Sequence, residues 1–234
     1  MATRSYTLLI GSGGTTGSGA IQNLSYCRQN VFDRNDDNST EALALPFSLD
    51  FLGSSYSEAY VSNNGYLTFD SPLTDYTPWP LADSSNAIIA PFFADVDTRN
   101  PASALVTYGS SPDGKTFCVN WVGVGYYDSH MDKVNSFQLL LVDRGEVAAG
   151  DFDIVFNYGP LNWETGDFSG GVGGIGGTSA RAGYSAGTGL PGTSYELPGS
   201  GTSGALIDGG TSPLGASSRG LGSPLGRYLF QIRN

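Results

Sequence analysis

The close spacing of turn-forming residues is the feature that most constrains how this chain folds. Short apolar stretches alternate with clusters of Gly, Asn, Asp, Ser and Pro, and glycine alone occurs 34 times. This is about twice the average usage of roughly 7%, and glycine destabilises helix interiors. Short strands joined by frequent turns are typical of sandwiches and barrels. We therefore predict an all-β fold, an antiparallel β-sandwich with Gly-rich loops and little helix.

Several stretches show the period-two alternation of strands that bury one face. In TFCVNWV, Phe117 and Trp121 fall on one face and Cys118 on the other. The stretch EAYVSNNGYLTF predicts a hairpin at Asn64-Gly65, a pair suited to the positive φ angles of a type I′ turn. Further strands are predicted at Ser5–Ile10, Leu45–Phe51, Val134–Asp143, Asp151–Gly159 and Gly226–Ile232.

The length of 234 residues fits one all-β domain. The Gly-rich stretch 169–226 still carries apolar residues at intervals, and a strand follows it at the C-terminus. We therefore expect residues 1–234 to form a single domain. In it, 169–226 supplies strands and loops folded onto the sandwich, and 227–234 supplies the closing strand.

The net charge of the chain limits its partners, and its apolar stretches limit its location. A formal net charge of -11 disfavours nucleic acid, because phosphate binding needs basic patches. No stretch approaches the ~18 apolar residues of a membrane span, so no membrane insertion is expected. The apolar patch near the N-terminus is too short for a signal peptide. We expect either that a signal has been removed or that the protein leaves the cell by a route that needs none.

The two cysteines, Cys27 and Cys118, allow two interpretations. In an extracellular protein they would form one disulfide, whereas two buried free thiols are the alternative. A zinc site is disfavoured, since two Cys and the single histidine, His130, leave the metal short of ligands.

The stretch IIAPFFADVDTR drives an apolar run into two like charges, Asp95 and Asp97. If the strand continues, both carboxylates and Arg99 lie on one face, because residues two apart in a strand share a face. Two neighbouring carboxylates repel, which favours a bound cation, a nearby Arg or strong solvation. Pairing with Arg99, a Ca²⁺ site and a catalytic acid pair all remain open.

A second Ca²⁺ candidate is DRNDDNST, where Asp33, Asn35 and Asp37 have the spacing of the first half of an EF-hand loop.

That second stretch departs from a true EF-hand. Asn38 stands where the loop requires Gly, and no Glu occupies loop position twelve. An Asp/Asn-rich turn is the alternative to a metal site. Ca²⁺ is accordingly the one cofactor that the sequence predicts.

Four residues are candidates for contact with a ligand: Tyr126, Tyr127, His130 and Trp163. An exposed Trp beside acids stacks on sugar rings, whereas a core position is the alternative for Trp163. His130 is the single histidine available for acid–base chemistry, and a polar loop is the alternative for its surroundings. Glu164 with a distant Asp is the acid pair that a glycosidase would need.

The combination of several segments resembles the nidogen-like extracellular domain family. The segments are LPFSLDFLGSSYSEAYVSNNGYLTF, NAIIAPFFADVDTR, NSFQLLLVD and FDIVFNYG, which together span Leu45–Phe168. Phe93 departs from the Trp that animal members commonly carry, and NDDNST resembles a turn of the bacterial branch. The resemblance implies a β-rich, secreted or extracellular module of basement-membrane, inner-ear matrix and bacterial secreted proteins, which acts in adhesion and not in catalysis.

We therefore expect a non-enzymatic adhesion or interaction module that binds protein, matrix or glycan partners, possesses Ca²⁺-stabilised loops and has the capacity to self-associate. Two alternatives stay open. A route out of the cell without a signal fits a structural or receptor-binding component of a phage tail, contractile injection particle or self-assembling fibre. The acids around Asp95 and Glu164 fit a glycan-active hydrolase.

Overall fold

The structure is a computed structural model that describes residues 19–233. The predicted strand Ser5–Ile10 lies outside these residues. Within them, strands alternate with long loops, and helical structure is confined to three short 3₁₀ helices. These are η1 (Ser25–Arg28), η2 (Leu81–Asp83) and η3 (Leu214–Ala216). None of the described helices is long and apolar enough to cross a membrane.

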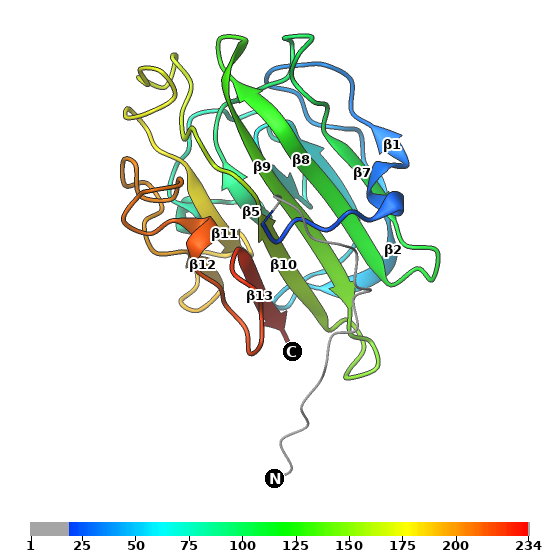
Figure 1. Ribbon diagram of the computed structural model, residues 1–234. Coiled ribbons are helices and arrows are strands. Elements are labelled where there is room, and N and C mark those ends of the chain that lie inside the picture. The colour runs from blue at the N-terminus through cyan, green and yellow to red at the C-terminus, as the bar shows by residue number, and fades with distance from the viewer. Residues whose placement is uncertain (1–18, 234) are drawn as a thin grey trace.

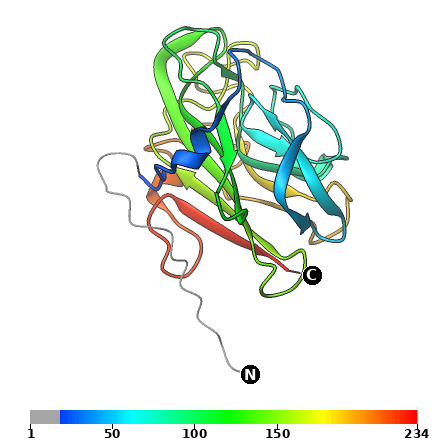
Figure 2. The same cartoon turned by 90° about the vertical axis from the view of Figure 1, so that its right-hand side faces the viewer.

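Two antiparallel sheets pack face to face, and the prediction of an all-β sandwich is confirmed. Figure 1 views the first sheet face on, and Figure 2 shows the two layers after a quarter turn. The first sheet has the order β1-β7-β8-β9-β10-β13, with β6 paired to β8. Its strands are β1 (Asn30–Val31), β6 (Val96–Asp97), β7 (Thr107–Ser110), β8 (Thr116–Tyr126), β9 (His130–Asp143), β10 (Phe152–Tyr158) and β13 (Arg227–Ile232).

The second sheet has the order β12-β11-β5-β4-β3-β2. Its strands are β2 (Leu43–Asp50), β3 (Ser55–Ser62), β4 (Tyr66–Thr68), β5 (Ile88–Phe93), β11 (Arg181–Ser185) and β12 (Ser194–Glu196). The Gly-rich stretch therefore supplies β11 and β12 to this sheet, and β13 closes the edge of the first sheet beside β10.

The alternation predicted for β8 matches the observed faces of that strand. Phe117 and Trp121 point into the core between the sheets, where Trp121 stacks on Phe137 with ring centroids 5.3 Å apart. Cys118 lies on the outer face, and η1 packs over it so that this face is also buried. The structure joins Cys118 to Cys27 of η1 in a disulfide.

The hairpin predicted between β3 and β4 is present, but its turn is not of type I′. Ser62 pairs with Tyr66, which leaves Asn63, Asn64 and Gly65 in the loop. A type I′ turn needs positive φ at both central residues. Here Gly65 alone of the three has positive φ, at +79°, and a Cβ at Gly65 would lie 1.9 Å from the Phe92 carbonyl oxygen. The asparagine side chains take other partners instead, and these partners build the site described below.

Glu164 ties the Gly-rich stretch to the sandwich. Its carboxylate is buried and accepts hydrogen bonds from the backbone N–H of Gly176 and of Gly204 and from the Ser203 hydroxyl. Hydrogen bonds to a buried charge are stronger than neutral ones, so this one residue organises two distant loops. A carboxylate so enclosed is a structural anchor, and it does not fit the glycosidase role considered for Glu164.

The disulfide makes a testable contribution to stability. It closes a loop with a sequence separation of 91 residues. Disulfides typically stabilise folded proteins by roughly 2–4 kcal/mol, mainly by restricting the unfolded chain, and loops of this length lie at or above the upper end of that range. We expect the Cys27→Ala/Cys118→Ala variant to unfold at a correspondingly lower urea concentration. Overlapping unfolding curves, together with two titratable thiols in the wild-type protein, would contradict the pairing.

Candidate metal centre

A break between two strands places Asp95 at the centre of the site. Strand β5 ends at Phe93 and β6 begins at Val96, so Asp95 directly follows a bend at Ala94 and does not lie in a continuous strand. The bend is held because Val96 N–H donates to Asn64 Oδ1 at 3.0 Å. The Asp95 side chain is turned into the protein, and the residue is only 1% exposed.

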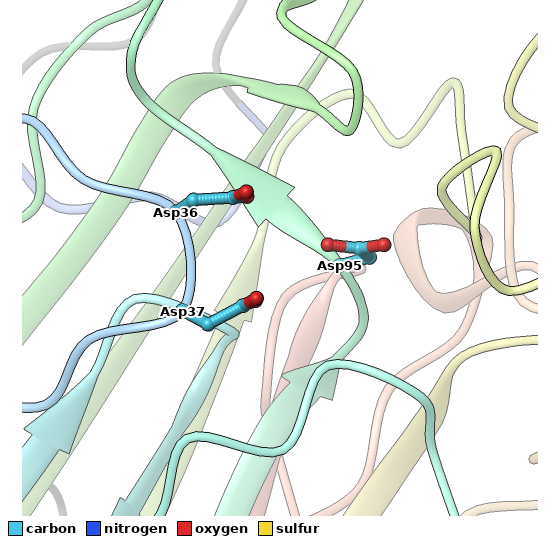
Figure 3. A group of neighbouring side chains, drawn as sticks. All are labelled: Asp36, Asp37 and Asp95. Atoms are coloured by element: carbon cyan, nitrogen blue, oxygen red, sulfur yellow. The ribbon is translucent and has the colours of Figure 1, made fainter.

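Two further carboxylates come from the loop that follows β1. The Asn63 amide donates to the Asp36 carbonyl at 2.8 Å, and the Asn64 amide donates to Asp37 Oδ1 at 3.0 Å. The asparagine turn thus holds this loop against the bend after β5. Figure 3 shows that Asp36, Asp37 and Asp95 point toward one another. One oxygen of each carboxylate lies within 4.8 Å of the others.

The Asp95 carboxylate has no polar partner among the described residues. Both of its oxygens are buried without a hydrogen bond, and so is Asp36 Oδ1. Burial, together with the charges of Asp37, Asp36 and Asp97, raises the pKa of Asp95 to about 8. Burial and the charges of Asp97 and Asp37 raise the pKa of Asp36 to about 7. An isolated buried charge is costly, so this arrangement favours either protonation or a bound cation.

Asp97 is satisfied separately, so the two aspartates do not act as a pair. Arg99 Nε lies 3.0 and 3.1 Å from the two Asp97 oxygens, and the backbone N–H groups of Arg99 and Ser129 donate to Asp97 at 2.8 Å. Burial by itself would raise the pKa of Asp97, but these hydrogen bonds outweigh it and lower the pKa. Of the two alternatives for Asp97, the structure shows the pairing with Arg99, and Asp97 lies outside the group of three acids.

Arg99 also reaches beyond Asp97. Its Nη2 atom lies 3.1 Å from an oxygen of Asp36 and 3.1 Å from an oxygen of Asp128. One guanidinium is thus shared by three acids, and none of these contacts extends to Asp95. The two aspartates therefore differ in what balances their charge. Arg99 neutralises Asp97, whereas Asp95 needs either a proton or a metal ion.

The EF-hand spacing selected only one residue of the cluster correctly. Asp37 lies in the cluster, but Asp33 is exposed and lies outside it. Asn35 uses its Oδ1 atom to accept from the Asn38 N–H at 3.1 Å, as in an Asx turn. Asp33 is therefore not part of this group of acids, the Asn35 side chain serves the turn, and the prediction of both as Ca²⁺ ligands stays a prediction. The sequence analysis missed Asp36 because the EF-hand pattern takes its ligands from alternate residues, and Asp36 lies between two of them. In the folded chain the side chain of Asp36 nevertheless points toward the other acids.

Two of the four predicted ligand contacts are excluded by burial. Trp163 is fully buried in the core, and its indole N–H donates to the Val124 carbonyl at 3.2 Å. Tyr126 is also buried, and its hydroxyl donates to Asp132. His130 stacks on the Tyr126 ring and lies 2.9 Å from Asp167, at the start of β9 rather than in a loop. Tyr127 alone of the four lines the cavity beside the acids.

That cavity opens from the acid cluster toward the surface. Its volume is about 250 Å³, and it is lined by Asp36, Asp37, Asp95, Arg99, Tyr76, Tyr127 and Phe168. Tyr76 and Phe168 were not singled out from the sequence, because they are far apart along the chain. The site therefore combines a carboxylate floor with aromatic side chains at its opening.

The donor set matches hard-cation chemistry. Ca²⁺ takes six to eight oxygen ligands, and carboxylates bind it with one or two oxygens each. The three side chains offer at most six such oxygens, so water or another ligand would complete the shell. Nitrogen and sulfur ligands of the kind zinc prefers are absent from this group of residues.

Comparison with known protein families shows which family the chain belongs to. The profile of the family described as NIDO related matches residues 14–202, and the chain belongs to that family. The match extends beyond the Leu45–Phe168 region that carried the resemblance, and it includes the loop with Asp36 and Asp37. Assignment to the bacterial branch stays a prediction. No solved structure matches the chain.

Several animal proteins are similar over most of this chain. Alpha-tectorin from Mus musculus is 33% identical over 196 residues, which cover 71% of this chain and 9% of alpha-tectorin. Nidogen from Drosophila melanogaster is 31% identical over 222 residues, which cover 84% of this chain and 15% of nidogen. The chain therefore spans only a small part of these much longer relatives.

The Arg99–Asp97 pair is testable by substitution. Arg99→Met leaves the buried Asp97 carboxylate without its partner, and we expect the free energy of unfolding in urea to fall by about 3 kcal/mol. Lys115→Met is the matched control, because the exposed Lys115 forms a long contact of 3.9 Å with the half-buried Asp143, and the loss of such a surface pair costs about 0.5 kcal/mol or less. Equal small losses in both variants would show that Arg99 is not the neutralising group.

The raised pKa of Asp95 predicts a pH dependence in protein freed of divalent cations. A carboxyl whose pKa rises from 3.8 to about 8 on folding binds its proton more tightly in the folded state. Stability therefore falls as pH increases between those values. We expect the melting temperature to decrease from pH 5 to pH 8, with a shallower decrease and a higher value at pH 8 in Asp95→Asn. Asp33→Asn, which changes an exposed acid, serves as the control and keeps the wild-type slope.

Proposed function

We propose that this domain is a non-enzymatic, extracellular interaction module that binds protein, matrix or glycan partners. Its membership of the NIDO-related family carries the proposal, since the similar nidogen and alpha-tectorin chains are extracellular matrix proteins. The disulfide between Cys27 and Cys118 suits an oxidising, extracellular location. The buried, fully bonded Glu164 and the Arg99-bound Asp97 disfavour the acid pairs that a hydrolase would use.

Ca²⁺ at Asp36, Asp37 and Asp95 is the second part of the proposal. The supporting observation is the Asp95 carboxylate, which is 1% exposed, has no hydrogen bond among the described groups and is aimed at two other acids. A divalent cation would supply the missing counter-charge. It would also connect the loop after β1 to the bend between the two sheets, and so stiffen the region around the cavity.

Thermal denaturation tests the cation. A ligand that binds only the folded state at about 100 times its Kd stabilises by about 2.7 kcal/mol. We expect Ca²⁺ to raise the melting temperature of the wild-type protein at pH 8 and to leave Asp95→Asn unchanged. Asp33→Asn should respond like the wild type, because Asp33 lies outside the cluster. A wild-type melting temperature that is the same in Ca²⁺ and in chelator would refute this part of the proposal.

Binding of the full chain to panels of matrix proteins, glycans and immobilised copies of itself tests the interaction role. We expect saturable binding to at least one panel member, with no turnover of any glycan offered. Hydrolysis that is lost in Asp95→Asn would overturn the non-enzymatic assignment. The particle-component alternative stays a prediction, which symmetric assemblies in electron micrographs would support.

A further inference from the structure

The aromatic side chains at the mouth of the cavity form a connected group. Phe168 lies edge-on to both Tyr76 and Tyr127, with ring centroids 5.6 and 6.3 Å apart. Phe168 is 70% exposed, in contrast to the many aromatic side chains buried in the core. Arg99 lies over the Tyr127 ring at 5.4 Å and so joins this group to the acid cluster. Apolar ring faces and carboxylate oxygens therefore line the same small cavity.

A cation bound by Asp36, Asp37 and Asp95 would keep coordination positions for an incoming ligand. Ca²⁺ takes six to eight oxygens, and three carboxylates with unidentate or bidentate contacts leave part of that shell free. The cavity lies between the carboxylates and the solvent, so the free positions would face it. Two adjacent hydroxyl groups of a sugar ring offer two oxygens at a spacing that one cation accepts. The apolar face of the same ring would then contact Phe168 or Tyr76.

The net charge around the cavity indicates whether its ligand is neutral or anionic. Asp97 and Asp128 also contact Arg99, so five carboxylates lie around this one guanidinium and the proposed divalent cation. The site keeps a net negative charge when the cation is bound, which disfavours a carboxylate from a partner protein. An ammonium group would compete with the cation instead of requiring it. A neutral polyol is the ligand class that tolerates both the charge and the aromatic walls.

We propose that the cavity lined by Asp36, Asp37, Asp95, Tyr76, Tyr127 and Phe168 is a Ca²⁺-dependent binding site for a neutral saccharide. The inference rests on the proposed function, because it uses the cation that was assigned above to the acid cluster. It goes further by naming the ligand class and the surface that recognises it. The volume of about 250 Å³ suits a single sugar unit at the end or side of a glycan.

The experiment measures binding of the full chain to an array of neutral and acidic oligosaccharides, in Ca²⁺ and in chelator. We expect binding to neutral saccharides in Ca²⁺ only, and competition by free methyl glycosides that carry vicinal hydroxyls. Phe168→Ala should weaken this binding by about tenfold, the effect of losing one aromatic contact. Leu221→Ala is the matched control, since Leu221 is a fully exposed apolar residue that does not line the cavity.

Calorimetric titration with Ca²⁺ alone separates failure of this inference from failure of the proposed cation. Asp95→Asn should lose both Ca²⁺ and saccharide binding, whereas Phe168→Ala should keep Ca²⁺ binding. If the wild-type protein binds Ca²⁺ but no saccharide, or if Phe168→Ala binds saccharide normally, the saccharide site is refuted and the cation stands. Ca²⁺-dependent binding to deglycosylated protein with no array signal would assign the cavity to a protein partner. Absence of Ca²⁺ binding would overturn the cation and the saccharide site together.

Discussion

The candidate site depends on the side chains of the asparagine turn between β3 and β4. Asn63 donates to the carbonyls of Val96 and Asp36, and Asn64 accepts from the Val96 N–H while donating to Asp37. The indole N–H of Trp121, in the opposite sheet, donates to the Asn63 carbonyl at 3.0 Å. One short turn therefore links the second sheet, the first sheet and the loop after β1. Buried amides that make several hydrogen bonds are costly to move, so the acids are held close despite their repulsion.

Electrostatics then divides the acids into two groups with different roles. Arg99 has a single positive charge, which makes a bidentate contact with Asp97 and also reaches Asp36 and Asp128. Asp95 receives neither a hydrogen-bond donor nor a paired counter-charge from the described residues, although it is buried as deeply as Asp97. A protein that only needed a stable turn at this position would be more stable with an uncharged side chain, because burial of a lone carboxylate is unfavourable. The unmet charge is what makes the cluster a candidate for ligand binding.

The sandwich and several of its details were predictable from local pattern. Alternation in TFCVNWV marked which side chains of β8 enter the core, and the Asn-Gly pair marked the hairpin. The exact turn was not predictable, because the partners of Asn63 and Asn64 come from segments distant in sequence. The position of Trp163 was left open for a related reason. A tryptophan beside an acid has the same local sequence whether it lies in the core or at the surface, and here it packs in the core against Phe92.

The candidate site shows the same division between local and tertiary information. The sequence by itself determined the all-β class, the acidic character, the family and the presence of an unusual acid pair after an apolar strand, because these follow from composition, periodicity and short motifs. Only the tertiary structure decided which acids meet. A bend between β5 and β6 separates the surroundings of Asp95 from those of Asp97, and contacts between distant segments bring Asp36 and Asp37 to Asp95. Charge balance and burial depend on such distant neighbours, so no local pattern determines them.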